Sequence, residues 1–343
     1  MKIQRLAIGA FAASALILSG CSSSAIPDKP SSSSADIGAA AAEVTIRYGS
    51  IYTADTTFGV AVAHMADAIK EASNGSIDVQ TFPGGTLGSE QNHAEAVQEG
   101  SLEMMESGTA GIGLYVPESA LFELWYANDS LDSLVAAFKE ATPKLDELYQ
   151  AQGFKLLGTF YNGPRSIIST VPVRDLGDVQ NLRLRVPGSE LYVQMAKGLG
   201  AQATALPLGD VYTGLQTGSI DAMEGGPDDI MKSGYGEVAK YLTLDEHVFQ
   251  PLSIIYSLDR WNALTPEQQT IVQDAATAAS EEQKDLLQSA NEKALADLEE
   301  QGVEIIKLSD RDEWVKKVQP AVEKFTEDYK ATGQFILNAL TKQ

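Results

Sequence analysis

The sequence predicts an α/β fold of two domains that are joined by a hinge, with one long helix spanning both. Three observations support this prediction. Strands alternate with helices in two separate stretches of the 343 residues, a length at which chains commonly divide into two domains. Two further stretches are candidates for strands that cross between the domains. Near the carboxyl end, a helical pattern continues for longer than one domain requires.

The first 42 residues predict export and attachment to a membrane. A basic head precedes an apolar run at residues 6–18, which is too short to span a bilayer and is typical of a secretory signal. The sequence Leu-Ser-Gly-Cys that ends at Cys21 resembles a bacterial lipobox. We expect a lipoprotein signal peptide at 1–20, acyl chains on Cys21 that enter the lipid bilayer, and a flexible tether at 21–42 that is rich in Ser and Ala. An ordinary signal peptide with a cysteine in its cleavage region is the alternative.

The next stretch has three predicted strands and two predicted helices. Apolar alternation and flanking glycines place the strands at 44–48, 77–82 and 102–105, and apolar residues at helical spacing place the helices at 60–71 and 91–98. This alternation predicts a parallel or mostly parallel sheet that is covered on both faces.

The second stretch repeats this arrangement and ends in the long helix. Strands are expected at 154–160, 166–170, 182–186 and 253–257, and helices at 192–198 and 211–217. Thr265-Pro266-Glu267-Gln268 then supplies a capping hydroxyl, a proline at the first helical position and a glutamine three residues after the cap. About 35 residues follow before Gly302, a helix of roughly 50 Å that we expect to span two domains.

These elements predict two α/β halves with a cleft between them. We expect domain I at 43–162 plus about 251–289, and domain II at 163–250 plus about 290–343. Open α/β sheets bind ligands beyond the carboxyl ends of their strands, and two hinged halves can close over what binds there. This geometry is typical of a hinged, type II-like solute receptor of the kind found in the periplasm.

Charge and motifs exclude several functional classes. The formal net charge of −22 repels nucleic acid and anionic headgroups, so neither is an expected partner. The sequence has no HExxH, GxSxG or phosphate-loop motif, its one cysteine is Cys21, and its three histidines share no metal-ligand spacing. We therefore expect no catalytic residues, no metal and no cofactor. Asp228-Asp229 and Glu281-Glu282 are acidic pairs that arise by chance in so acidic a chain.

Three arginines are more informative. In residues 182–187, apolar residues take one face of a strand while Arg183 and Arg185 take the other. Pro187 ends this strand, which places Arg185 at its carboxyl end, where ligands bind. Arg165 follows the first crossing segment. A guanidinium fork matches a carboxylate, so one or both of Arg185 and Arg165 fit an acidic small molecule. Internal ion pairs are the alternative.

Long motifs of this sequence resemble one receptor family. Residues 182–224, LRLRVPGSELYVQMAKGLGAQATALPLGDVYTGLQTGSIDAME, resemble the substrate-binding subunits of tripartite ATP-independent periplasmic (TRAP) transporters. The block FPGGTLGSEQNHAEAVQEGSLEMMESGTAGI and the segments EVAKYLTLDEH and LTPEQQTIVQDAA are similar to others of the same family. The resemblance covers about residues 44–340.

The resemblance implies roles for several residues. The carboxylate-binding arginine of the family falls on Arg185, a supporting arginine on Arg165, and the acidic residue of a D-G-x-E turn on Glu224. An asparagine that commonly follows this glutamate and contacts substrate is replaced by Gly225, which removes one polar side chain from the pocket that the resemblance implies. The sequence Asp-Glu-His that ends at His247 resembles the corresponding segment of family members that take sugar acids.

Four further residues are candidates for binding, because their places in the predicted fold fit a receptor cleft. Tyr52 lies in the loop after the first strand, Gln91 near a helix start and Thr109 after a strand end. Tyr212 matches a family motif, and packing in the core is the alternative for it.

Together these features predict an extracytoplasmic receptor, lipid-anchored in the periplasm or at the outer face of the cytoplasmic membrane. It is expected to bind a small organic acid, such as a uronate, aldonate or dicarboxylate, and to deliver it to the TRAP membrane permease. One alternative is a receptor that presents its ligand to a sensor protein. The other is an exported sugar-acid hydrolase or isomerase, for which Asp55, Glu90 and Glu224 are the nearest acid and base candidates.

Overall fold

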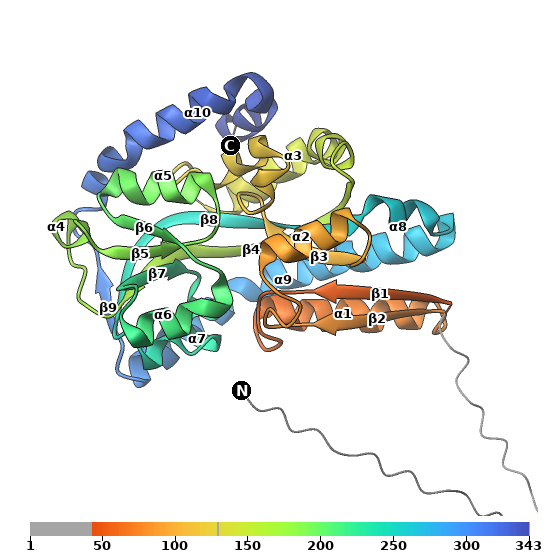
Figure 1. Cartoon of the computed structure of the whole chain (residues 1–343), viewed down its shortest axis with the longest axis horizontal. Helices are drawn as coiled ribbons and strands as arrows, with labels where there is room; N and C mark the ends of the chain where they lie inside the picture. Colours follow the sequence, from red (N-terminus) through yellow and green to blue (C-terminus); the bar gives the residue numbers. More distant parts are fainter. Residues whose placement is uncertain (1–42, 129, 343) are drawn as a thin grey trace, which may run out of the picture. The chain divides into compact units, whose positions relative to one another are not determined.

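The computed structural model describes residues 43–128 and 130–342, so the predicted signal peptide, Cys21 and the tether lie outside the described residues. Within them one sheet of nine strands forms the centre of the molecule (Figure 1). The strands are β1 Val44–Gly49, β2 Ile77–Phe82, β3 Met104–Gly108, β4 Phe154–Ser169, β5 Arg183–Val186, β6 Gln202–Ala205, β7 Ala222–Gly225, β8 Tyr241–Ser257 and β9 Glu304–Lys307.

The strand order is β2-β1-β3-β8-β4-β7-β5-β6, with β9 paired to β8. The pairs at each end, β1 with β2 and β3, and β5 with β6 and β7, are parallel. The long central strands β4 and β8 are antiparallel to each other, and each is antiparallel to its other neighbour on this path. The α/β prediction is confirmed, but the sheet is mixed, because β8 is antiparallel to the group of β1, β2 and β3, and β4 is antiparallel to the group of β5, β6 and β7.

Three of the predicted strands are parts of two much longer strands. The sequence predicted separate strands at 154–160 and 166–170, and another at 253–257, whereas β4 and β8 each continue as one strand. The register between them shifts on either side of Arg165, and this irregularity accommodates Pro164 without ending the strand. Proline and glycine here mark a bulge, which is why the sequence pattern indicated a break.

All five of the predicted helices are present. The α-helices are α1 Thr57–Ala72, α2 Glu90–Gln98, α3 Leu131–Gln150, α4 Leu176–Val179, α5 Glu190–Leu199, α6 Val211–Thr217, α7 Pro227–Lys232, α8 Leu258–Ala263, α9 Pro266–Glu300 and α10 Arg311–Thr341. Short 3-10 helices are η1 Ile112–Leu114, η2 Pro117–Glu123, η3 Leu208–Asp210 and η4 Tyr235–Glu237. Helix α1 begins earlier than predicted, because the Thr56 side chain caps it by accepting a hydrogen bond from Gly59 N.

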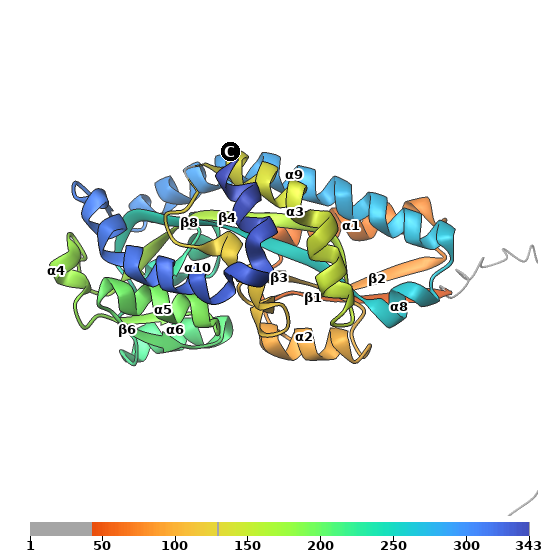
Figure 2. The same cartoon turned by 90° about the horizontal axis from the view of Figure 1, so that it is seen from above.

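Helix α9 confirms the prediction of a long helix that starts at Thr265. The Thr265 hydroxyl accepts from Gln268 N at 3.3 Å, and the Gln268 side chain accepts from Thr265 N at 2.9 Å, which completes the capping box. The helix extends from α8, beside β1 and β2, to β9 (Figures 1 and 2). It packs against α1, β4 and α7, so it contacts elements from both of the α/β stretches of the chain.

The buried side chains form three clusters around the sheet. One joins α1 and the first half of α9, and a second joins α6, α7 and the last turns of α9. The largest includes α3, α5 and α10, which lie together in both views (Figures 1 and 2). Among the helices of the described residues, none has both the length and the apolar character that crossing a bilayer requires.

The predicted domain boundaries remain a prediction. They fall near residues 162, 250 and 289, inside β4, β8 and α9, and all three elements continue through these points without interruption.

Candidate ligand-binding site

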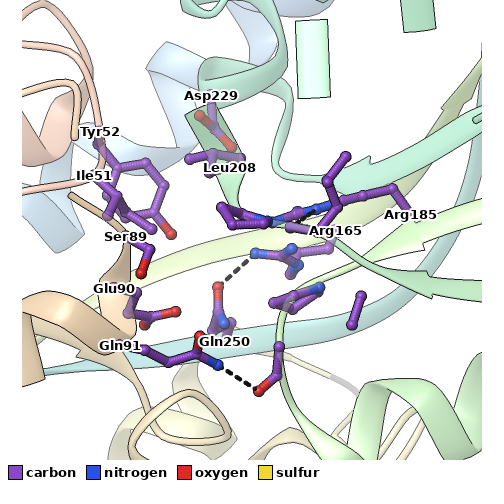
Figure 3. A pocket seen from close by; sticks show the side chains of 15 residues that line it. Ile51, Tyr52, Ser89, Glu90, Gln91, Arg165, Arg185, Leu208, Asp229 and Gln250 are labelled. Atoms are coloured by element: carbon purple, nitrogen blue, oxygen red, sulfur yellow. Dashed lines mark hydrogen bonds between the residues drawn. The ribbon is translucent and has the colours of Figure 1, made fainter. Parts of the chain in front are cut away.

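A pocket lies where several strands of the sheet end. Ile51 and Tyr52 follow β1, Pro187 and Gly188 follow β5, and Leu206 follows β6. Arg165 of β4, Gln250 of β8, Glu90 and Gln91 of α2, Arg185 of β5 and Asp229 of α7 complete the polar lining. Figure 3 shows Tyr52, Glu90 and Gln91 on one wall and Arg185 on the opposite wall. The pocket thus lies beyond the strand ends, where the predicted fold places a ligand site.

Arg185 is the least compensated cation in the pocket. It is only 4% exposed, and its Nε donates to the Leu206 carbonyl oxygen at 2.8 Å. Within residues 43–128 and 130–342, no protein oxygen accepts from its two terminal nitrogens and no carboxylate forms an ion pair with it. Burial lowers the pKa of Arg185, because desolvation disfavours the charged form. The guanidinium fork therefore faces the pocket without a protein carboxylate to bind it.

Arg165 lies beside Arg185, but its bonds within the protein are nearly complete. Its Nε donates to Glu224 Oε2 at 2.6 Å and its Nη2 to Glu224 Oε1 at 2.8 Å, while its Nη1 donates to Gln250 Oε1 at 2.5 Å. Burial lowers the pKa of Arg165, but Glu224 outweighs burial and the pKa lies well above its usual value. Arg165 thus lines the pocket as one half of a buried ion pair.

Behind the pocket lining, Glu224 contacts further buried ionisable side chains. His247 Nε2 lies 3.3 Å from Glu224 Oε2, and its Nδ1 lies 2.9 Å from Asp245 Oδ2. Burial alone would raise the pKa of Glu224, but Arg165 and His247 outweigh it and bring this pKa to about 2. Burial would lower the pKa of His247, but Asp245 and Glu224 raise it to about 8. Glu224 itself has no exposed surface and does not line the pocket.

Two carboxylates share the pocket with the arginines. Glu90 Oε1 accepts from Ser107 Oγ at 2.7 Å and from Gly108 N at 3.0 Å, and Asp229 Oδ1 accepts from Ser233 Oγ at 3.1 Å. Burial raises the pKa of Glu90, and it raises the pKa of Asp229 to about 6. The pocket therefore presents hydrogen-bond acceptors as well as a free guanidinium.

The remaining predicted site residues divide between the pocket and its surroundings. Tyr52 is buried in the lining, and Gln91 donates across the pocket to the Gly188 carbonyl oxygen at 3.2 Å (Figure 3). Thr109 lies behind the lining and donates to Glu123 Oε1 at 2.7 Å. Tyr212 lies outside the pocket on α6, half-buried, with its hydroxyl donating to Glu237 at 2.7 Å. Gly225, at the end of β7, also lies outside the lining.

Arg183 lies apart from the pocket, as its distance from the strand end predicted. Its Nε donates to Asp221 Oδ2 at 2.9 Å, and its side chain is 44% exposed. The two arginines of β5 therefore differ: Arg183 forms an internal ion pair, whereas Arg185 faces the pocket.

The sequence did not identify Asp229 or Gln250 as site residues. The available signal for Gln250 was a polar side chain directly before Pro251 and the apolar residues that follow it in β8. Among the described residues, no group of three or more His, Cys, Asp or Glu side chains is arranged to hold a metal ion. Asp55, an acid candidate for the enzyme alternative, lies 3.6 Å from Lys232 and does not line the pocket.

Comparison with known proteins gives a consistent result. Residues 48–328 match the family model described as bacterial extracellular solute-binding protein, family 7. The 2,3-diketo-L-gulonate-binding periplasmic protein of Escherichia coli K12 is 27% identical over 275 residues, which cover 78% of this chain and 82% of that protein.

Two solved structures with bound sugar acids are similar to this chain. A TRAP periplasmic solute-binding protein from Pseudomonas putida F1 with D-glucuronate has a TM-score of 0.81 and 29% identity, covering 85% of this chain and 96% of the other. The sugar acid binding protein of Advenella mimigardefordensis with galactonate has a TM-score of 0.82 and 29% identity, covering 87% and 98%. These likenesses confirm the two-domain periplasmic-binding-protein fold that the sequence predicted.

Proposed function

Since this chain belongs to bacterial extracellular solute-binding protein family 7, the family of TRAP solute receptors, we propose that it binds a sugar acid through Arg185. The ligand class is a monocarboxylate that carries several hydroxyl groups, such as a uronate or an aldonate. Support for this class comes from the similar structures, which hold D-glucuronate and galactonate.

The free guanidinium of Arg185 is the observation on which the proposal rests. Its terminal nitrogens form a planar fork that matches the two oxygens of a carboxylate. The side chain is buried, so a carboxylate bound there is screened less by water and salt than one at the surface. The net charge of −22 does not oppose binding, because salt screens charges that lie more than about 8 Å away.

The other polar groups of the lining fit the hydroxyl groups of such a ligand. Tyr52 and Gln91 offer a hydroxyl and an amide that both donate and accept, while Gln250 accepts from Arg165 and donates to Glu123. Arg165 adds positive potential, and Glu224 holds it in place. Thr109 and Tyr212 lie outside the lining, where Thr109 donates to Glu123 and Tyr212 donates to Glu237.

We also propose delivery of the ligand to a TRAP membrane permease from an extracytoplasmic, lipid-anchored position. The lipobox-like sequence at Cys21 and the Ser- and Ala-rich residues 22–42 support the anchor. Two or three acyl chains on one residue are enough for stable attachment. Neighbouring genes for permease subunits, and loss of uptake when they are deleted, would test this step.

A thermal-shift screen tests the ligand class. The panel contains uronates, aldonates, dicarboxylates and keto acids, each at a series of concentrations. A ligand at 100 times its dissociation constant adds ~2.7 kcal/mol of stability, which shifts the melting temperature by roughly 2–4 °C for domains of this size. Stabilisation by uronates or aldonates is expected, with no product formed on prolonged incubation. Failure of every sugar acid to shift the melting temperature would contradict the proposal.

A further inference from the structure

Asp229 lines the pocket from the first turn of α7. The residue is 3% exposed and lies in the lining with Arg185 and Arg165 (Figure 3). Its Oδ1 accepts from Ser233 Oγ at 3.1 Å. In the described part of the chain, no protein donor reaches Oδ2. The protein thus supplies a hydrogen-bond donor to one oxygen and leaves the other without one.

Gly225 makes the room that this carboxylate occupies. A Cβ atom at residue 225 would lie 3.4 Å from Asp229 Oδ2, 3.4 Å from Met223 Cε and 3.5 Å from Ile230 Cγ1. The backbone at Gly225 is not among the positive-φ positions, so its conformation does not require glycine. A methyl group would fit at ordinary contact distance, whereas a longer side chain would have to displace Asp229 or its two apolar neighbours. The small residue therefore favours the placement of Asp229 beside the pocket.

The chemistry of this oxygen restricts what can lie next to it. An ionised carboxylate only accepts hydrogen bonds. Arg165 and Arg185 keep negative charge at Asp229 favourable, against the burial that raises its pKa to about 6. On the opposite wall Glu90 supplies a second acidic group, one oxygen of which is already bonded to Ser107 and Gly108. A neutral donor such as a hydroxyl fits between these walls, whereas a second carboxylate of the ligand would face like charge.

We propose that Asp229 is a specificity-determining residue of the receptor, accepting a hydrogen bond from a ligand hydroxyl and disfavouring acids with two carboxylates. The inference rests on the proposed function, because it assumes that the ligand's carboxylate binds Arg185. It adds to that function the reason why a hydroxylated monocarboxylate is preferred to a dicarboxylate.

Titration calorimetry with a matched pair of ligands tests the inference. D-galactonate and D-galactarate differ only at one end, where a hydroxymethyl group is replaced by a second carboxylate, and succinate serves as a dicarboxylate without hydroxyls. Wild-type protein is expected to prefer D-galactonate. Asp229→Asn should weaken galactonate binding by about tenfold or more, since a charge-assisted hydrogen bond is lost, and should reduce the preference over both dicarboxylates.

Asp228→Asn is the matched control, because it makes the same chemical change on the adjacent residue. Asp228 lies outside the pocket and accepts from Thr57 N at 2.8 Å, at the start of α1. This variant should leave the ratio of the ligand affinities unchanged. Gly225→Ala and Gly225→Asn give a second test if Asp229→Asn does not fold: the alanine should be tolerated, and the asparagine should displace Asp229 and lower galactonate affinity.

The possible failures are distinguishable. If wild-type protein binds no acid in the panel, the proposed function fails, and this inference fails with it. If the wild type binds galactonate and Arg185→Lys loses it, but Asp229→Asn and Gly225→Asn both keep the wild-type affinity ratio, only the role of Asp229 is overturned.

Discussion

Arg165 and Glu224 form a bidentate ion pair at the wall of the pocket, with Nε–Oε2 and Nη2–Oε1 distances of 2.6 and 2.8 Å. The Glu224 side chain has no exposed surface and that of Arg165 is 5% exposed. Two charges buried this deeply depend on each other, because removing one leaves the other without compensation. The pair thus holds Arg165 in place and leaves Arg185 as the guanidinium that is free to bind a ligand.

Removal of the Glu224 charge should therefore destabilise the fold. Glu224→Gln is expected to lower the free energy of unfolding by about 3–5 kcal/mol, as for other buried pairs that lose one partner. Urea denaturation measures this change. Asp221→Asn is the control, because it breaks the Arg183 pair, in which the arginine is 44% exposed, and should change stability by ~1 kcal/mol or less. If the two substitutions lowered the free energy of unfolding equally, burial would not be the reason that the Arg165–Glu224 pair matters for stability.

The buried His247 should make stability depend on pH. Its pKa of about 8 lies above the ordinary value of 6.5, because Asp245 and Glu224 outweigh the effect of burial. The folded state thus binds this proton more tightly than the unfolded state does. The resulting stabilisation is complete below about pH 6.5 and is lost as the pH rises through about 8.

His247→Gln isolates this contribution. The wild type should exceed the variant in free energy of unfolding by more at pH 6 than at pH 9, as measured by urea denaturation at both values. An equal difference at the two pH values would show that His247 is not charged in the folded protein.

Cys21 is expected to be the only attachment to the membrane. Cys21→Ser should leave the melting temperature unchanged and release the protein into the soluble fraction, because the variant lacks the thiol that would carry acyl chains. Fractionation followed by immunoblotting measures this. Recovery of the Ser variant in salt-washed membranes would reveal another anchor.

Ligand binding should make the protein more compact if the two predicted domains close over the pocket. Gln91 already reaches the Gly188 carbonyl oxygen across it, a contact that separation of the walls would break. Small-angle scattering should give a smaller radius of gyration for the wild type when it is saturated with a confirmed ligand. The radius of gyration of Arg185→Lys should not change at the same ligand concentration. An unchanged wild-type value would indicate a rigid site.

The sequence predicted those features that depend on local patterns. The capping box at Thr265, the long helix α9 and the position of Arg185 at the end of β5 are all readable from neighbouring residues. The unbroken strands β4 and β8 were missed, because Pro164 lies at a register shift that only the pairing of distant strands reveals. The sequence left open whether Arg165 binds a ligand or forms an internal ion pair, because its partner Glu224 is 59 residues away.

The roles of Asp228 and Asp229 show a further limit. The sequence presented them as one acidic pair, but adjacent residues of a helix point about 100° apart. Asp228 therefore accepts a hydrogen bond from Thr57 N at the start of α1, whereas Asp229 lines the pocket. Which of them faces a ligand depends on how α7 is placed against β7 and α9, and no spacing in the chain encodes that placement.

Titration calorimetry of Arg185→Lys and Arg183→Lys with a sugar acid that binds the wild type tests the carboxylate site most directly. Lysine keeps the charge at either position but loses the planar fork. Arg185→Lys should weaken binding by about tenfold or more, since a charge-assisted hydrogen bond contributes ~1.5–3 kcal/mol. Arg183→Lys should have a much smaller effect, because Arg183 is paired with Asp221 outside the pocket. Melting curves confirm that both variants fold. Normal binding by Arg185→Lys together with loss of binding by Arg183→Lys would contradict the placement of the carboxylate at Arg185.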